Sequence, residues 1–358
     1  MKSNTKLFIG MDISEKSIEI LGLSGSNDKS NSLSIPNTAE AVSGFIDNYK
    51  GDKKDLVFAL EAGTHSPWLE ELITQKGCEV YIGNARKIKM IWGDDMKSDP
   101  IDAKKLARLL KFDPKLLYPI KHRPQENRVD LSVIKCRHAL VQVKTDLMNC
   151  VRGQLKSFGV KTTSLKPYNF SSTASGIMPD KLCFAMEGLL TQIKLLDIEI
   201  RNYDKKVDQL CKKYPVTNKL RQIKGVGPLV ALAFVLIIGD PKRFKNRRRL
   251  SAYLGLVPRR FQSGETDRQM PITKTGNTML RWLLVQAGNY ILGPFGEDSD
   301  LRDFGMKIRN RGNSVARNKA KVAVARKLAI LLHTLWISEE EYIPQYKKFK
   351  KGKLKTVA

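Results

Sequence analysis

The sequence lacks the cysteine and histidine patterns of a disulfide framework or a zinc site. It has five cysteines in 358 residues, an odd number, and they are widely spaced. The four histidines form no C-x-x-C or H-x-x-x-H arrangement with them. The pattern therefore argues against a disulfide scaffold and against zinc, and these side chains are interpreted as ordinary core or surface residues.

The sequence also has few long apolar runs, and the pattern typical of a signal peptide is not expected near Met1. The longest apolar run, Leu229 to Ile238, is shorter than the roughly 18 to 20 residues that a membrane-spanning helix needs. Met1 to Leu7 leads straight into a predicted strand, without the order of basic, apolar and small residues found in signal peptides. We therefore expect a cytoplasmic protein that has no membrane partner.

Acidic residues are few relative to basic ones. The chain has 63 Lys plus Arg against 36 Asp plus Glu, so its formal net charge is +27. A surplus of this size favours a polyanionic partner, and nucleic acid fits better than a membrane because no segment could span a bilayer. The length suffices for two or three domains that each bury a core.

Residues 1 to about 112 alternate between strand and helix signals. Strands are predicted near 6–12, 17–23, 31–35, 55–61 and 78–83, and helices near 38–50, 66–76 and 100–111. A meander of three strands followed by alternating strands and helices is typical of a mixed α/β sheet of the RNase H or RuvC type. Actin-like ATPases share this core, but Asp12 is not followed by the glycine-rich phosphate turn that they use.

Four carboxylates are placed where such a sheet would bring them together. Asp12 ends the first predicted strand, and Glu61 ends a buried one. Asp99 and Asp102 lie three apart at the start of a helix, so they share one face. An alternative is that these two only cap the helix around Pro100. Four acids at one point would repel each other unless a divalent cation lay between them, so the set predicts a Mg²⁺ site.

The middle of the chain has helical periodicity, first from 121 to about 160 and again from 182 to 210. A loop rich in Ser and Thr, 162–175, separates the two predicted helices. The second helix continues for more than three heptads, which predicts a coiled coil. The heptads leave open whether the partner helix belongs to the same chain or to another.

Two features of the next segment indicate contact with phosphate. Residues 223–231 match the helix-hairpin-helix turn, in which two glycines let the backbone approach a phosphate, although a plain helix-helix turn is an alternative. A basic run without an acid then crowds around Phe244, and phosphate would relieve the repulsion within it. The predicted contacts are Lys224, Gly225, Gly227, Lys242, Arg243, Lys245, Arg247, Arg248 and Arg249.

A basic loop containing Ser263 is predicted next. By its spacing alone Ser263 is an ordinary loop serine, because a hydroxyl needs a base, a metal or a cationic pocket to attack phosphorus. Helices are expected from Thr278 to Leu292 and from Ala316 to Trp336, with a looser segment between them. The predicted nucleic-acid contacts around the loop are Arg259, Arg260, Arg268, Lys274, Asn277 and Arg281.

Taken together, these motifs resemble the transposases of the insertion sequence 110 type. The resemblance covers nearly the whole chain and depends on the order and spacing of its motifs. Those motifs are Gly10-Met11-Asp12, Leu60-Glu61-Ala62-Gly63-Thr64, Lys97-Ser98-Asp99-Pro100-Ile101-Asp102-Ala103, Gly225-Val226-Gly227, Gly239-Asp240-Pro241, Leu254-Gly255-Leu256-Val257-Pro258-Arg259, Gln262-Ser263-Gly264 and Lys274-Thr275-Gly276-Asn277. Pro100 is a departure from the family pattern, and it suits the first position of a helix.

The resemblance implies a DEDD recombinase that is guided by a bridge RNA. Ser263 would form a covalent phosphoserine link to DNA while strands at donor and target sites are cut and rejoined. The implied oligomer is a dimer of dimers, in which the RuvC-like domain of one subunit meets the serine domain of another. The four acids that would bind Mg²⁺ are Asp12, Glu61, Asp99 and Asp102.

The same resemblance divides the chain into four parts. They are a RuvC-like metal-binding domain at 1–120, a coiled-coil or helical-hairpin region at 121–212, a mainly helical transposase domain with the serine at 213–340, and a basic tail at 341–358. Two other functions stay open: a RuvC-type Holliday-junction endonuclease that uses water, and a non-catalytic nucleic-acid-binding scaffold.

Overall fold

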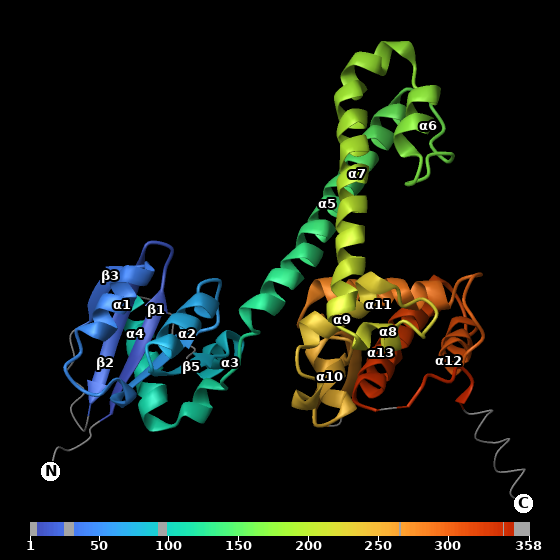
Figure 1. The fold of residues 1–358 in the computed structure, drawn as a ribbon. Coiled ribbons are helices and arrows are strands. Elements are labelled where there is room, and N and C mark those ends of the chain that lie inside the picture. Colours follow the sequence, from blue (N-terminus) through green and yellow to red (C-terminus); the bar gives the residue numbers. More distant parts are fainter. Residues whose placement is uncertain (1–5, 25–31, 92–98, 265, 339, 347–358) are drawn as a thin grey trace, which may run out of the picture. The chain divides into compact units, whose positions relative to one another are not determined.

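The computed structural model describes residues 6–24, 32–91, 99–264, 266–338 and 340–346. The chain forms two compact units, residues 1–122 and 123–358 (Figure 1). Within the described ranges, no helix is long and apolar enough to cross a membrane. The finer division of the second unit into a hairpin region, a serine domain and a tail stays a prediction, and residues 347–358 of the tail lie outside the described ranges.

A five-stranded mixed sheet is the frame of the N-terminal unit. Its strands are β1 Leu7–Ile13, β2 Ser17–Ser24, β3 Leu33–Pro36, β4 Leu56–Glu61 and β5 Glu79–Gly83, in the order β3-β2-β1-β4-β5. The first three strands pair antiparallel as a meander, whereas β4 pairs parallel with both β1 and β5. This confirms the predicted mixed α/β sheet, and the strand order is consistent with the RNase H or RuvC type.

Helices cover both faces of this sheet, because β1 and β4 carry apolar residues on both. On one face, α1 (Ala39–Asp47) and α2 (Ser66–Gln75) share a core with strand residues such as Ile9 and Phe58. On the other, α4 (Asp99–Phe112) packs on β1, β2 and β4. These helices confirm the predicted ones.

Short elements were not predicted in this unit. The helix α3 (Ala85–Ile91) follows β5, where the sequence has three basic residues and little apolar periodicity. Two 3₁₀ turns, η1 (Lys53–Asp55) and η2 (Pro114–Leu117), start after Asp residues whose carboxylates accept backbone N–H bonds. Each is a local capping structure, which hydrophobic periodicity cannot reveal.

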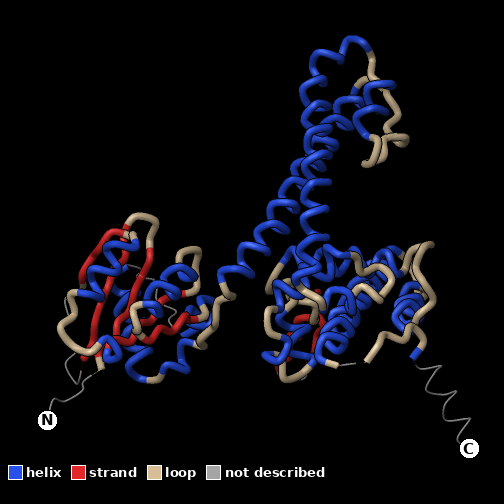
Figure 2. Tube along the Cα trace, viewed as in Figure 1, coloured by secondary structure: helices blue, strands red, loops and turns tan. Residues whose placement is uncertain are grey.

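The second unit begins with a helical hairpin (Figures 1 and 2). Its long helices, α5 (Gln125–Ser157) and α7 (Cys183–Lys213), run antiparallel, because ion pairs join early residues of one to late residues of the other. These pairs are Asp130–Lys213, Arg137–Asp204 and Lys144–Asp197. The heptads therefore have a partner within the chain, and a coiled coil between chains stays a prediction.

The tip of the hairpin has a core of its own, built from Met148, Val151, Leu155, Met186, Leu190 and Ile193. The helix α6 (Phe170–Ile177) and the 3₁₀ turn η3 (Asp180–Leu182) close it. The predicted Ser- and Thr-rich loop at 162–175 is thus wrong in its second half. The serines are tolerated in α6 because Ser171 and Ser175 donate to backbone carbonyls within or beside the helix.

The remainder of the second unit is a helical body around α9 (Pro228–Ile238), whose residues from Ala231 to Ile238 are all buried. A single core joins α9 to the surrounding helices. These are α8 Val216–Leu220, α10 Arg247–Tyr253, α11 Thr278–Ile291, α12 Asp300–Arg309 and α13 Ser314–Ile337, with the 3₁₀ turn η4 Pro241–Arg243.

Two expectations for this body are wrong. The predicted basic loop around Ser263 is an antiparallel hairpin of β6 (Pro258–Ser263) and β7 (Thr266–Ile272), seen as the two short red strands of the second unit in Figure 2. The segment expected to be loose contains α12, which Ser299 caps by accepting a bond from Arg302 N. Every residue of β6 is exposed, so the hairpin has no alternation of apolar and polar residues that would reveal a strand. α12 does have an apolar face, with Leu301 and Gly305 buried, but it has only ten residues.

Candidate active site and nucleic-acid surface

Asp12 and Glu61 lie beside each other at one edge of the sheet. β1 and β4 are parallel, and their last pair is Met11 with Leu60, so each acid is the next residue along its strand. The carboxyl ends of parallel neighbours share one edge, which brings the two side chains together. Asp12 is half-buried and Glu61 is exposed, so Glu61 is not desolvated by its position at the end of a buried strand.

Gly10 allows the third acid, Asp102, to join them. A Cβ on Gly10 would lie 1.9 Å from Ala103 O and 2.6 Å from Ala107 N, so only glycine lets α4 pack this closely on β1. Asp102 lies in the first turn of α4, and its Oδ1 is 3.5 Å from Lys105 Nζ. The three acids, Asp12, Glu61 and Asp102, line one cavity of about 310 Å³.

Asp99 is the first residue of α4, three before Asp102, as expected. Its side chain lies outside the described part, as do the whole of Lys97 and Ser98. Among the side chains that are described, no three Asp, Glu, His or Cys converge closely enough to hold one metal ion. The cavity nevertheless offers only carboxylate oxygens as charged donors, and hard cations such as Mg²⁺ prefer oxygen donors. In donor chemistry, the residues present fit a divalent cation.

Two further side chains line this cavity and were not identified from the sequence. His65 Nε2 lies 3.3 Å from Glu15 Oε2, and His65 Nδ1 accepts from Trp68 at 3.4 Å. The hydroxyl of Ser66 donates to Gly63 O at 2.9 Å. Both belong to the turn after β4, and a turn that follows a strand ending in an acid is the signal that could have revealed them.

Ser66 is the first residue of α2 and not its N-cap. His65 occupies the N-cap position without a side-chain capping bond, and Ser66 begins the helix. Ser66 is fully buried, accepts a bond from Gly63 N at 3.0 Å, and lies 2.8 Å from His122 Nε2. Its bonds therefore hold the turn that follows Glu61.

Ser263 is the last residue of β6 and lies at the tip of the hairpin in the second unit. It pairs with Thr266 across a turn that contains Gly264, whose φ of +55° is in the left-handed region. Ser263 is exposed. By the register, Phe261 pairs with Arg268, so these two residues share the face of Ser263. Phe261 is 61% exposed, and the serine is thus flanked by an open aromatic ring and a cation.

The other face of the hairpin carries an ion pair. Arg260 donates two hydrogen bonds to Asp267, of 2.9 and 2.8 Å, and this contact lowers the pKa of the Asp267 carboxyl. Arg259 reaches only the carbonyl of Thr273, at 3.5 Å. Lys274 is exposed and has a positive φ of 54°, which turns the chain toward α11. The cations predicted around Ser263 therefore lie on or next to the hairpin.

The helix-hairpin-helix candidate lies between α8 and α9. Gly225 has a φ of +98°, and a Cβ there would lie 2.9 Å from the Tyr290 ring, so this glycine is required by packing on α11. Gly227 precedes α9, is exposed, and has nothing within 4 Å of an added Cβ. Lys224 is exposed beside them. Only the second glycine therefore has space for a ligand.

The basic run surrounds the start of α10. Lys242, Lys245 and the arginines at 247–249 are exposed. Arg243 differs, because its guanidinium stacks on Phe244 and Tyr253 at 4.8 and 4.7 Å and donates to Ile238 O at 3.3 Å. The three arginines form the first turn of α10, where a helix favours negative charge. They therefore oppose the helix dipole unless an anion is present.

Two predicted contacts are engaged inside the fold. Arg281 is 9% exposed, and its guanidinium donates to Leu254 O at 3.2 Å and Thr275 O at 2.8 Å. Burial lowers the pKa of this group. Asn277 caps α11 by accepting a bond from Leu280 N at 2.8 Å. This placement argues against direct contact of Arg281 with nucleic acid.

Comparison with known proteins identifies the family. The family model for DEDD-type IS110 transposases matches residues 9–159, and the model described as the transposase IS116/IS110/IS902 family matches residues 217–292. The first match includes all four candidate acids, and the second includes Ser263 and the basic run. The chain belongs to the IS110/IS116/IS902 family of transposases.

Curated relatives agree with this assignment. The transposase for insertion sequence element IS1111A of Coxiella burnetii is 31% identical over 59% of this chain and 59% of that protein. A probable family 20 transposase of Pseudomonas aeruginosa is 29% identical over 80% of this chain and 85% of that protein. A putative transposase of Sinorhizobium fredii, y4pF/y4sB, is 27% identical over 80% of this chain and 74% of that protein. The match thus spans about three fifths of the length of the first relative.

Proposed function

We propose that this chain is an insertion-sequence recombinase that cuts DNA strands at donor and target sites and rejoins them through a covalent phosphoserine intermediate. The observation that carries the proposal is the cavity lined by Asp12, Glu61 and Asp102, which come from three separate elements of one sheet unit. Carboxylates gathered in this way are the usual holders of the divalent cations used in phosphoryl transfer.

The three acids, with Asp99 from the same helix turn, would hold Mg²⁺. When bound there, Mg²⁺ would neutralise charge that develops on the phosphate and lower the pKa of an attacking hydroxyl. The chain's own contribution is positional. Gly10 fixes the distance between α4 and β1, and the bonds of Ser66 fix the turn after Glu61. Asp12 and Glu61 are therefore held at the sheet edge, and Asp99 and Asp102 on the helix packed against it.

Ser263 is the proposed nucleophile. Its Oγ would form a bond to phosphorus as the bond from phosphorus to the departing deoxyribose oxygen breaks, and that oxygen gains a proton as the serine loses one. A phosphoserine ester is again a phosphodiester, so rejoining can run by the reverse step without ATP. The exposed hairpin tip beside Arg268 supports this role, because a DNA strand can reach it.

The basic second unit would hold nucleic acid by its backbone. The three arginines of the first turn of α10 and the open Gly227 turn are suited to phosphate. A guide RNA of the bridge type would supply the sequence readout by base pairing. A dimer of dimers, joined through coiled coils, would bring the sheet unit of one subunit to the serine of another.

Covalent trapping tests this proposal. The protein is incubated with its co-purified RNA, Mg²⁺ and labelled donor-junction DNA, denatured, and examined for label on the protein. Thr266→Ala is the matched control, because Thr266 carries the hydroxyl paired with Ser263 at the same hairpin tip. An adduct in wild type and Thr266→Ala that disappears in Ser263→Ala supports the phosphoserine intermediate.

A second candidate is a RuvC-type endonuclease that hydrolyses DNA with water. It is favoured by one observation, that the three described acids line a cavity formed by residues 11–102 of the first unit. Cleavage without any adduct in the trapping experiment would make this candidate the better account. Unchanged recombination after replacement of all four acids would instead favour a non-catalytic scaffold.

A further inference from the structure

A second cavity, of about 830 Å³, lies in the C-terminal body where the end of α11 meets α12 and the start of α13. Four of its lining side chains are cations, and no Asp or Glu among the described residues lines it. None of the contacts predicted from the sequence belongs to it. The cations are Arg302, Arg309, Arg317 and Lys321.

Two of these cations are structural. Arg302 Nη1 donates to Ile291 O at 2.5 Å and to Gly293 O at 2.7 Å, and Arg309 Nη1 donates to Leu292 O at 2.7 Å. They thereby supply donors to carbonyls at the end of α11 and just beyond it, which have no partner within that helix. Their positive charge nevertheless stays at the wall of the cavity.

The other two cations do not stabilise a helix end in this way. Arg317 and Lys321 lie one turn apart in the first two turns of α13, and neither side chain has a hydrogen bond or an ion pair with any residue that the structure describes. Like charges at this spacing repel each other. The N-terminus of a 24-residue helix adds positive potential at the same place. The positive charge of the cavity therefore favours binding of an anion, and none of the described side chains that line it is an anion.

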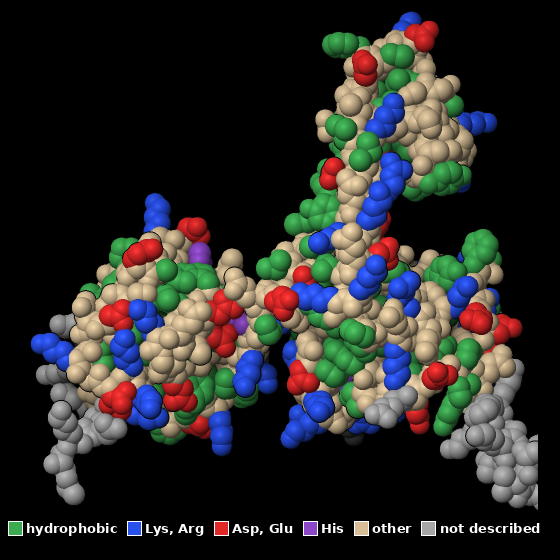
Figure 3. All heavy atoms as spheres, in the orientation of Figure 1, with side chains coloured by type: hydrophobic (Ala, Val, Ile, Leu, Met, Phe, Trp, Pro, Cys, Tyr) green, Lys and Arg blue, Asp and Glu red, His purple; other side chains and the backbone are tan. Residues whose placement is uncertain are grey.

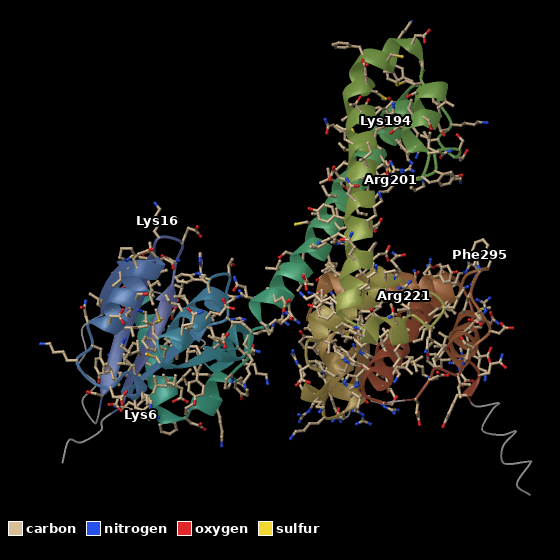
Figure 4. All side chains as sticks on the ribbon, in the orientation of Figure 1. Lys6, Lys16, Lys194, Arg201, Arg221 and Phe295 are labelled. Carbon is tan, nitrogen blue, oxygen red and sulfur yellow. The ribbon has the colours of Figure 1, made fainter. Side chains whose placement is uncertain are left out.

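An exposed aromatic side chain stands next to this cavity. Phe295 follows Pro294, which lines it, and is 78% exposed. Figure 4 shows its ring pointing away from the helices, out of the loop between α11 and α12. The same loop carries Asp298, whose carboxylate lies 3.9 Å from Nε of the structural Arg302. Burial of this ring against an apolar or aromatic partner would be favourable, and the flat face of a base offers such a surface.

From this juxtaposition we infer that the cavity and Phe295 form a subsite for one unpaired nucleotide, whose phosphate lies between Arg317 and Lys321 while its base stacks on Phe295. An open aromatic ring beside a cationic groove is the arrangement that binds single-stranded nucleic acid, because every base has a flat face. The inference rests on the proposed nucleic-acid function, but it is tested by binding alone and needs no strand cleavage.

The test measures fluorescence anisotropy of short labelled RNA and DNA of one sequence, single-stranded and duplex, at several salt concentrations. One variant carries Arg317→Ala with Lys321→Ala, and its control carries Lys194→Ala with Arg201→Ala, which removes the same charge from exposed positions of α7 (Figure 4). Figure 3 shows Lys and Arg side chains along the helical hairpin to which α7 belongs. A second variant is Phe295→Ala, with Phe295→Trp as rescue. Its control is Phe184→Ala, which removes an aromatic ring that is 95% exposed on α7.

For single strands, the inference predicts that the double cavity variant lowers the slope of log affinity against log salt concentration by about 0.7, the value for one phosphate, and that its control lowers it by less. Phe295→Ala should weaken single-strand binding about tenfold and duplex binding less than twofold, with affinity restored in Phe295→Trp. Loss on RNA alone, or on DNA alone, identifies the natural strand. Equal losses in the cavity and α7 variants, or no loss in Phe295→Ala, would overturn the inference. Either result would leave the trapping experiment on Ser263 unaffected.

Discussion

The two units position their candidate residues by different means. In the first, Asp12, Glu61 and Asp102 come from two strands and a helix, and they meet only because strand register and helix packing are correct. In the second, Ser263 and Arg268 lie on one short hairpin whose local turn sets their positions. The acid site should therefore be sensitive to packing far from the acids, whereas the serine site should be sensitive mainly to the side chains themselves.

Removal of one acid should have the largest effect. We expect Asp102→Asn to lower strand cleavage by about 100-fold or more, since a bound metal contributes several kcal/mol of transition-state stabilisation. RNA binding should stay within about twofold, because one charge scarcely changes the field of a strongly basic chain. Cleavage assays on donor DNA and RNA anisotropy measure the two quantities.

Glu40→Gln is the matched control for Asp102→Asn. It makes the same change from carboxylate to amide in the first turn of α1, in the same unit, and Glu40 does not line the cavity. Equal loss of cleavage in both variants would contradict the special role of Asp102, and so would loss of RNA binding in Asp102→Asn.

A change in packing should disturb the acid site without touching an acid. Gly10→Ala places a Cβ 1.9 Å from Ala103 O, so we expect it to destabilise the unit by about 1–3 kcal/mol and to move Asp102 from Asp12. Gly44→Ala in α1 meets nothing within 4 Å and should stabilise by about 0.5–1 kcal/mol. Urea unfolding measures both. If Gly10→Ala kept wild-type stability and cleavage, the position of α4 on β1 would not depend on the close contact at Gly10.

The sequence was sufficient for the sheet and for the long helices, because their apolar periodicity is strong. β4 is one continuous buried run, and α5 and α7 repeat apolar residues over many turns. The β6–β7 hairpin was missed because every described residue of β6 is exposed, so it has no alternation of apolar and polar residues. The acids could be found from their positions at strand ends and at a helix start, whereas His65 and Ser66 were missed because their only signal is the turn that follows Glu61.

Two arginines of the second unit should separate stability from binding. Arg281→Met leaves the carbonyls of Leu254 and Thr275 without their donor, and we expect a loss of about 1–3 kcal/mol in unfolding free energy. Arg248→Met removes an exposed cation, and should lower the salt slope of DNA binding by about 0.9 while changing stability by less than about 0.5 kcal/mol. A loss of stability in Arg248→Met, or a lower salt slope with normal stability in Arg281→Met, would contradict the surface described for this unit.

The smallest effect on stability is expected at the base of the α5–α7 helical hairpin, outside both candidate sites. Burial and then a hydrogen bond to Asp130 raise the pKa of Tyr214 to about 12 from 10.0. Because the folded pKa is the higher one, this contribution to stability is complete below pH 10 and is lost between pH 10 and about 12. Asp130→Asn should lower the pKa of Tyr214, as measured by ultraviolet titration of tyrosinate. Tyr214→Phe should remove the titration step near pH 12. If that step persists in Tyr214→Phe, it belongs to another tyrosine.

The claim that joins the two units is that Ser263 attacks DNA only with the help of a divalent cation held by the acids. The most direct measurement is the yield of covalent protein–DNA adduct as Mg²⁺ is titrated into wild type and Asp102→Asn, with nucleic-acid binding monitored in parallel. We expect no adduct without Mg²⁺, a saturable rise in wild type, and little adduct in Asp102→Asn despite normal binding. An adduct on Ser263 that forms equally well without Mg²⁺ or in Asp102→Asn would contradict the account.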